Sequence, residues 1–182
     1  MTVSAAQVVN FANAPTIGGA AFPSGAMTLI STQTASGASL LSWTGLTGSN
    51  WMIMMNNLAA GTASAAIYIQ AGYGGSPTWG TSSNYYTNIY WETSTAVATN
   101  FSTTYVLLAD ATTTGSTSVR TSGTLFINSQ MPGNAAVLGI TQSYSMPYSV
   151  IISGGANTNG NPVTGLRIGV SSGTFSAGTA SL

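Results

Sequence analysis

Short runs of β-branched, aromatic and aliphatic residues recur along most of the chain, and Gly, Asn, Ser or Pro residues bound each run. Such runs are typical of β-strands, and no segment shows the 3.6-residue apolar period of an amphipathic helix. The expected strands lie at 27–32, 38–43, 51–55, 66–70, 85–91, 105–108, 124–128, 136–141, 149–153, 166–170 and 173–182, with turn-rich connections at 45–50, 72–77, 112–116 and 154–162. About ten or eleven short strands predict an all-β fold, an antiparallel β-sandwich or jelly roll over residues 27–182.

The first 26 residues differ from the rest of the chain. Between residues 10 and 23 they carry two prolines and only isolated hydrophobic residues. Such a segment has too little continuous apolar surface for a core of its own, so we expect an extended N-terminal arm that docks on the same domain, a sister subunit or a larger particle. The candidate anchoring residues of this arm, residues 1–26, are Phe11, Pro15, Ile17 and Phe22.

Charged side chains are almost absent from the sequence. They number four, Glu92, Asp110, Arg120 and Arg167, and the chain has no histidine, cysteine or lysine. The usual general base, thiolate nucleophile, Schiff-base amine and soft metal ligands are therefore missing, which predicts a protein that is not an enzyme and needs neither metal nor cofactor. Two arginines neutralise few phosphates, so nucleic acid is not an expected partner. A net charge of zero favours self-association instead.

The apolar residues do not form a membrane-spanning pattern. Gly, Ser, Thr and Asn interrupt every apolar run well before the roughly 18 residues that a transmembrane helix needs. The first residues, Met1 to Ser4, carry no positive charge and lead into no sustained apolar stretch. We therefore expect no membrane insertion and synthesis in a cytoplasm without a cleaved leader.

The two carboxylates define one enzymatic alternative. A glycosidase needs two acids that flank a glycosidic bond, so Glu92 and Asp110 make a polysaccharide depolymerase the sharpest hypothesis of that class. Asp110, however, precedes a turn-rich stretch in which Asp commonly stabilises a turn. Ion pairing with Arg120 or Arg167 is the expected role of both acids.

Aromatic residues are concentrated between residues 73 and 91. Rings among small polar neighbours present rigid amphipathic area that suits carbohydrate and protein contacts. Side chains alternate along a strand, so one set of these rings is expected in the core and the other on the surface. The candidate receptor or glycan contacts are Trp79, Tyr85, Tyr86, Tyr90 and Trp91.

Several stretches also resemble a known group of proteins. The runs 29–46, 67–79 and 83–86, and the closing stretches 151–155 and 163–182 with their Arg-containing strand, Ser-Gly turn and last strand, are similar to the β-sandwich domain of tailed-bacteriophage virion proteins. The phrase at 11–19 resembles short repeats near the attachment end of phage fibre proteins. The likeness covers residues 27 to 182 and part of the arm.

The resemblance implies a structural virion protein, such as a fibre, tail or head-decoration protein. Members of this group are often trimeric, which implies a homotrimer here, assembled in the host cytoplasm and located in the virion. The arm would hold other virion proteins, and the β-domain would face outward, where it could contact a host-surface glycan or protein. A cellular adhesin module is the remaining alternative, and the missing export signal argues against it.

Overall fold

The structure is a computed structural model, and its described part consists of strands and connecting turns. The backbone is described for residues 16–17, 20–21, 28–48, 50–63, 65–79, 85–91, 97–100, 105–109, 120–131, 134–143, 149–157 and 161–182, and side chains for 28–48, 50–63, 65–79, 105–109, 120–128 and 161–182. Within these ranges there is no helix. The strands are β1 (Thr16–Ile17), β2 (Ala20–Ala21), β3 (Thr32–Thr34), β4 (Leu40–Thr44), β5 (Asn50–Ala60), β6 (Ile67–Tyr73), β7 (Thr78–Trp79), β8 (Tyr85–Trp91), β9 (Val97–Asn100), β10 (Val106–Ala109), β11 (Arg120–Met131), β12 (Asn134–Ser143), β13 (Ser149–Asn157), β14 (Val163–Val170) and β15 (Phe175–Ser181).

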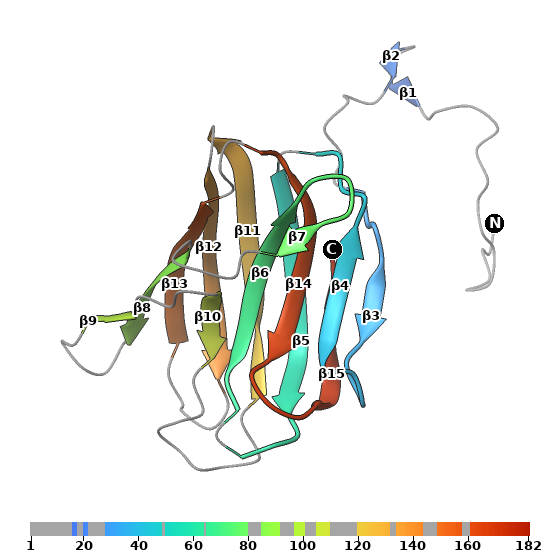
Figure 1. The fold of residues 1–182 in the computed structure, drawn as a ribbon. Helices are drawn as coiled ribbons and strands as arrows, with labels where there is room; N and C mark the ends of the chain where they lie inside the picture. The colour runs from blue at the N-terminus through green and yellow to red at the C-terminus, as the bar shows by residue number, and fades with distance from the viewer. Residues whose placement is uncertain are drawn as a thin grey trace, which may run out of the picture.

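Two antiparallel sheets form a sandwich (Figure 1). In the larger sheet β3, β15, β5 and β11 are neighbours in that order, and in the smaller sheet the order is β10, β6, β14 and β4. If these eight strands are numbered 1 to 8 along the chain, their order is 1-8-3-6 in the larger sheet and 5-4-7-2 in the smaller sheet. This is the strand order of a double-sheet jelly roll. The prediction of an antiparallel sandwich or jelly roll is confirmed.

Additional strands extend the jelly-roll core. The hairpin partner of β11 is β12, which continues to β13, and then to β8 and β9, so the larger sheet has eight strands. The smaller sheet gains β7, which pairs with β6. Both extensions come from chain inserted between core strands: β7, β8 and β9 lie between β6 and β10, and β12 and β13 lie between β11 and β14.

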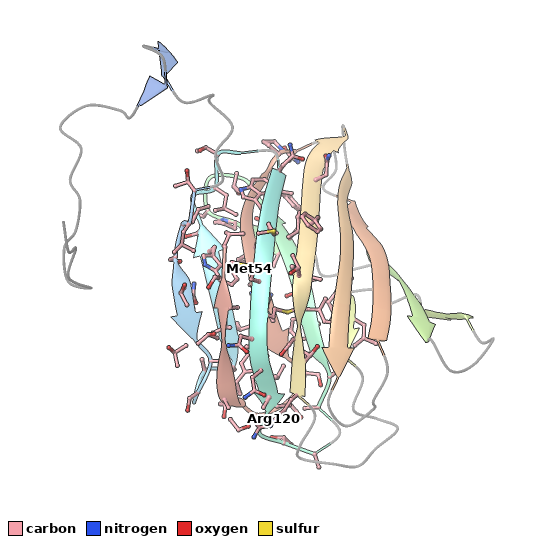
Figure 2. The ribbon with its side chains drawn as sticks, turned by 180° about the vertical axis from the view of Figure 1, so that it is seen from behind. Met54 and Arg120 are labelled. Carbon is pink, nitrogen blue, oxygen red and sulfur yellow. The ribbon has the colours of Figure 1, made fainter. Side chains whose placement is uncertain are left out.

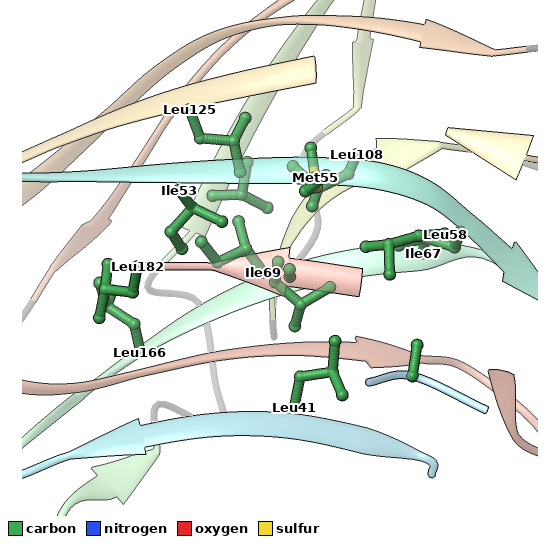
Figure 3. Close-up of a cluster of buried hydrophobic side chains, with 14 of the residues drawn as sticks. Leu41, Ile53, Met55, Leu58, Ile67, Ile69, Leu108, Leu125, Leu166 and Leu182 are labelled. Atoms are coloured by element: carbon green, nitrogen blue, oxygen red, sulfur yellow. The ribbon is translucent and has the colours of Figure 1, made fainter. Parts of the chain in front are cut away.

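The core lies between the two sheets, where alternate residues of facing strands meet (Figure 3). In β4 the buried and exposed residues alternate strictly, and in β5 they alternate over the first half of the strand. This period of two buries one face of each sheet. The largest fully buried side chains are Leu41, Ile53, Leu58, Ile67, Ile69, Leu108, Leu125, Ile127, Leu166, Ile168 and Phe175.

Polar side chains join the two sheets along one margin. The Gln33 side-chain amide donates to the Ser42 carbonyl at 2.6 Å, and its oxygen accepts from the Ser42 N–H at 3.1 Å. The indole N–H of Trp43 donates to Ser31 Oγ at 2.9 Å. Because β4 ends the smaller sheet, Gln33 acts as a substitute for a neighbouring strand and protects an edge that would otherwise invite pairing.

Most strand boundaries differ from the sequence-based expectations by one to five residues, and β7 and β9 were not expected as strands. Two of these differences have a clear physical reason. Residues 28–31 are not a strand, because the N–H groups of Ile30 and Ser31 both point to the Leu182 carbonyl, at 2.6 and 3.3 Å, and regular pairing begins only at β3. Within the predicted turn at 154–162, residues 154–157 belong instead to β13 and pair with β12. The extended strand carries two glycines there, which local turn signals could not distinguish from a loop.

The described part of the arm is a short antiparallel pair. Ile17, in β1, pairs with Ala20, in β2. The other proposed anchoring residues, Phe11, Pro15 and Phe22, lie outside the described residues.

Candidate functional site

The five predicted contact residues belong to two different sheets. Trp79 lies in β7 on the smaller sheet, whereas Tyr85, Tyr86, Tyr90 and Trp91 lie in β8 on the larger sheet. The predicted strand at 85–91 is confirmed, and the side chains of β8 lie outside the description. The best-defined candidate site is therefore the surroundings of Trp79.

Trp79 rests against the bare backbone of two strands. A Cβ added at Gly72 would lie 2.9 Å from Trp79 Cε3, and one added at Gly165 would lie 3.0 Å from Trp79 Cη2. Pro77 fills the same space, 2.8 Å from the Gly72 position and 2.9 Å from the Gly165 position. These two glycines face each other across β6 and β14, so together they form a shallow seat for the ring.

A guanidinium lies over the same ring. Arg167 Cζ is 4.3 Å from the centroid of Trp79, and Arg167 Nε donates to Gln70 Oε1 at 2.6 Å. Arg167 and Gln70 are register partners on adjacent strands, and Gln70 is buried. A cation over an indole face is stabilised by about 0.5–1 kcal/mol at an exposed site. The hydrogen bond to a buried amide orients the guanidinium plane.

Two tyrosines continue this surface. The rings of Tyr68 and Tyr105 stack with centroids 4.6 Å apart and an interplanar angle of 19°. Tyr68 lies over Gly169, where an added Cβ would be 2.5 Å from Tyr68 Cζ. Burial raises the pKa of Tyr68, and the nearby positive charge of Arg167 opposes part of that rise.

We call these five residues, Tyr68, Gln70, Trp79, Tyr105 and Arg167, the Arg167 cluster. It combines a positive charge, a buried amide and three aromatic rings on the outer face of the smaller sheet. Such a surface offers stacking area and a hydrogen-bonding cation, which are the groups that recognise sugar rings and planar polar groups. Among the described residues no three His, Cys, Asp or Glu side chains come together to hold a metal.

Sequence reasoning identified Trp79 but missed the other four members. One signal was present in the segment from Gly165 to Gly169, where glycines lie two positions before and two positions after Arg167. On a strand these three residues share a face, so the arginine has no neighbouring side chain along its own strand. That pattern indicates a surface on which rings from other strands can lie.

The remaining predicted residues are not tested by these contacts. Glu92 and Asp110 lie outside the described residues, so the depolymerase hypothesis and their pairing with arginine stay predictions. Arg120, the second arginine, donates from Nη1 to Asn57 Oδ1 at 3.1 Å on the exposed end of β11.

Comparisons with known proteins returned no match among family models, curated proteins or solved structures. In the part of the chain that the structure describes, no helix has the length and apolar character needed to cross a lipid bilayer.

Proposed function

We propose that this protein is a non-enzymatic structural component of a tailed-bacteriophage particle, either a fibre or a decoration protein. Residues 1–26 attach it to other virion proteins, and the jelly roll is displayed on the outside. Copies of the chain associate with one another, as the resemblance to trimeric virion proteins implies.

The strand order of the core carries this proposal. The double-sheet jelly roll is the fold of many viral coat domains and of many lectins. Fold alone does not define function, so the jelly roll supports the virion role by analogy. It agrees with the composition, because four charged residues in 182 suit a chain surrounded by other protein better than one that diffuses freely.

Protein identification in purified particles tests this role. The virus whose genome encodes the chain is purified by density, and its proteins are digested with chymotrypsin, because trypsin has only the two arginines to cleave. The proposal expects peptides of this chain at a constant ratio to the main coat protein. Recovery only from the soluble fraction of infected cells would overturn it.

The arm is tested by deletion. A chain that lacks residues 1–26 should keep the circular dichroism and thermal transition of the β-domain but fail to enter particles. A deletion variant found on particles at the wild-type ratio would show that attachment uses another surface.

The Arg167 cluster is the proposed host contact. If it binds a surface glycan, Trp79→Ala should weaken binding of the recombinant chain to host cells or their isolated polysaccharide by about fivefold to a hundredfold or more, an expected loss of about 1–3 kcal/mol for one stacking ring. Ser172→Ala, an exposed change in the connection between β14 and β15 and outside the cluster, is the control. Equal binding by both variants would remove the cluster from the host-contact role.

A further inference from the structure

An apolar strip crosses the outer face of the larger sheet. Phe126 on β11 is 57% exposed and Met54 on β5 is 49% exposed, and Met52 is the register partner of Phe126. Figure 2 shows Met54 on this outer face, in the middle of β5. Beyond the end of β15 the strip continues with Leu29 and Ile30, which are 64% and 51% exposed. Large apolar side chains gathered in this way on a surface mark an interaction site.

A cavity lies beside the exposed phenylalanine. Its volume is about 240 Å³, and it is lined by Thr28, Leu29, Ile30, Asn50, Trp51, Met52, Met54, Ser181 and Leu182. A cavity of about 150 Å³ already accepts a benzene ring, so this one has room for a phenylalanine side chain. Met52 belongs to the cavity wall and is also the cross-strand neighbour of Phe126. A protruding ring and a hollow that fits such a ring therefore lie side by side on one face.

The described border of this strip is polar but uncharged. On β5 and β11 the exposed neighbours are Asn50, Asn56 and Asn128, and Arg120 lies apart at the end of β11. Symmetric pairing of two copies brings a surface against itself, so charges of one sign repel across it. Asn, Ser and Thr both donate and accept hydrogen bonds, so they can pair with their own kind.

We propose that this face is the interface with a second copy of the same chain, related by a two-fold axis. The axis runs between Phe126 and the cavity, so each Phe126 enters the cavity of the other copy. An isologous contact has this reciprocal form, in which residue i meets j and j meets i. The centre is then aromatic and methionine-rich with an uncharged polar rim, as in stable protein interfaces.

The available area is sufficient for such a pair. The 11 residues of β5 extend over roughly 36 Å, and the four neighbouring strands from β3 to β11 are roughly 19 Å wide. The four strands β3, β15, β5 and β11 have 3, 7, 11 and 12 residues, so their flat footprint is about 520 Å². The accessible surface of a face covered with side chains exceeds its flat area, which brings this face toward the roughly 800 Å² that each partner buries in a specific interface.

The inference deepens the self-association in the proposed function, and it favours a pair over the trimer that the resemblance implies. A ring of three copies needs the protrusion and the hollow on different sides of the molecule. Here both lie on one side. The two ideas fail separately, because the interface is tested in solution and the particle role is tested on virions.

The first test is the solution mass of the full-length chain and of two matched variants, measured by light scattering across a concentration series. The wild type should have the mass of two 18.3 kDa chains. Phe126→Ser should raise the dissociation constant at least tenfold, as expected for a central aromatic side chain. Leu40→Ser, at an exposed leucine on the other sheet, should leave the dissociation constant unchanged. A monomeric or trimeric wild type, or a Phe126→Ser dimer of unchanged strength, would overturn the proposal.

A second test does not depend on how well one variant folds. The chain has no cysteine, so a mixture of two single-cysteine proteins, Phe126→Cys and Leu29→Cys, can form a mixed disulfide only between different molecules. The mixture should cross-link under mild oxidation far more than a mixture of Phe126→Cys with Leu40→Cys. Equal cross-linking in the two mixtures would contradict the proposed pairing.

Discussion

On the outer face of the smaller sheet, large side chains pack where glycine neighbours leave the backbone uncovered. Trp79 lies where Gly72 and Gly165 expose backbone, and Tyr68 lies over Gly169. On the outer face of β14, the nearest residues before and after Arg167 are Gly165 and Gly169, two positions away. Its guanidinium therefore lies in a space that rings from β6 and β7 border. The glycines thus determine where the large residues can pack, although they contribute no contact surface of their own.

The buried residue Thr121 leads to a testable prediction about stability. Thr121 is fully buried in β11, and among the described side chains its Oγ1 is a buried polar atom without a hydrogen-bond partner. Burying a hydroxyl without a partner is unfavourable. Thr121→Val, which replaces this hydroxyl by a methyl group, should therefore leave the free energy of unfolding unchanged or raise it by up to about 1 kcal/mol, measured by urea denaturation.

The matched variant is Thr121→Ser, which keeps the hydroxyl and removes the methyl group. It should lower the free energy of unfolding by about 1 kcal/mol, because it leaves a small gap in the core. A Val variant less stable than wild type by more than about 1 kcal/mol would mean that the hydroxyl makes a stabilising hydrogen bond.

At the scale of elements, β5 is irregular toward both of its neighbours. Its register shifts against β11 between Thr121 and Gly123, and against β15 near Ala177 and Thr179. Asn57 has a φ of 54°, and its N–H donates to Ser122 Oγ at 2.8 Å, which satisfies a backbone group that the ladder does not pair. Such bulges increase strand twist and let long strands curve around a sandwich core.

The close approach of β15 to this bulge predicts that a side chain at Gly178 is not tolerated. Gly178 has a φ of 108°, and an added Cβ would lie 2.5 Å from the Asn57 carbonyl oxygen and 2.6 Å from Leu58 Cα. Both atoms are backbone, so neither can rotate away. Gly178→Ala should lower the free energy of unfolding by about 2–4 kcal/mol, through strain and forced strand displacement, measured by thermal or urea denaturation.

Gly75→Ala is the control for this change. Gly75 lies in the turn after β6, and nothing lies within 4 Å of its Cβ position. This variant should stay within about 0.5 kcal/mol of wild type. If the two variants were equally stable, β15 would not lie as close to β5 as described.

At the scale of the whole molecule, the last core strand, β15, pairs with the first, β3. β15 inserts between β3 and β5, so Ser181 pairs with Thr32 on one side and with Met54 on the other. Thr32 Oγ1 and Ser181 Oγ lie 2.8 Å apart, a hydrogen bond between residues 149 positions apart. Contacts over such separations make folding slow and dependent on the complete core.

Truncations at the two ends of the chain should have opposite effects on folding. Removing residues 174–182 deletes β15 and separates β3 from β5, so the product should be insoluble or lack a cooperative thermal transition. Removing residues 1–26 deletes no core strand and should preserve the transition. A cooperative transition in the first variant would show that the jelly roll tolerates loss of its eighth core strand.

Local composition determined much of the fold before any tertiary information. A strand is recognisable from its own residues, because a two-residue period and β-branched or aromatic side chains act within one segment. The prediction of a strand at 85–91 is therefore correct to the residue, and the other predicted strands agree to within five positions at each end, whereas β7 and β9 were not predicted. The predicted turn at 154–162 is wrong over residues 154–157, because glycines occur both in turns and in strands with close neighbours.

The sequence alone thus determined that the chain is all-β, nearly uncharged and built of many strands. Tertiary structure alone decided which strands are neighbours, because pairing of β3 with β15 joins segments that share no local signal. It also decided that Trp79 lies with Arg167, Gln70, Tyr68 and Tyr105, since their meeting depends on the register of four strands, β6, β7, β10 and β14. The sequence likewise could not show that the Phe126 side chain is exposed. Alternation shows that residues share a face, but only the packed sandwich shows which face is left uncovered.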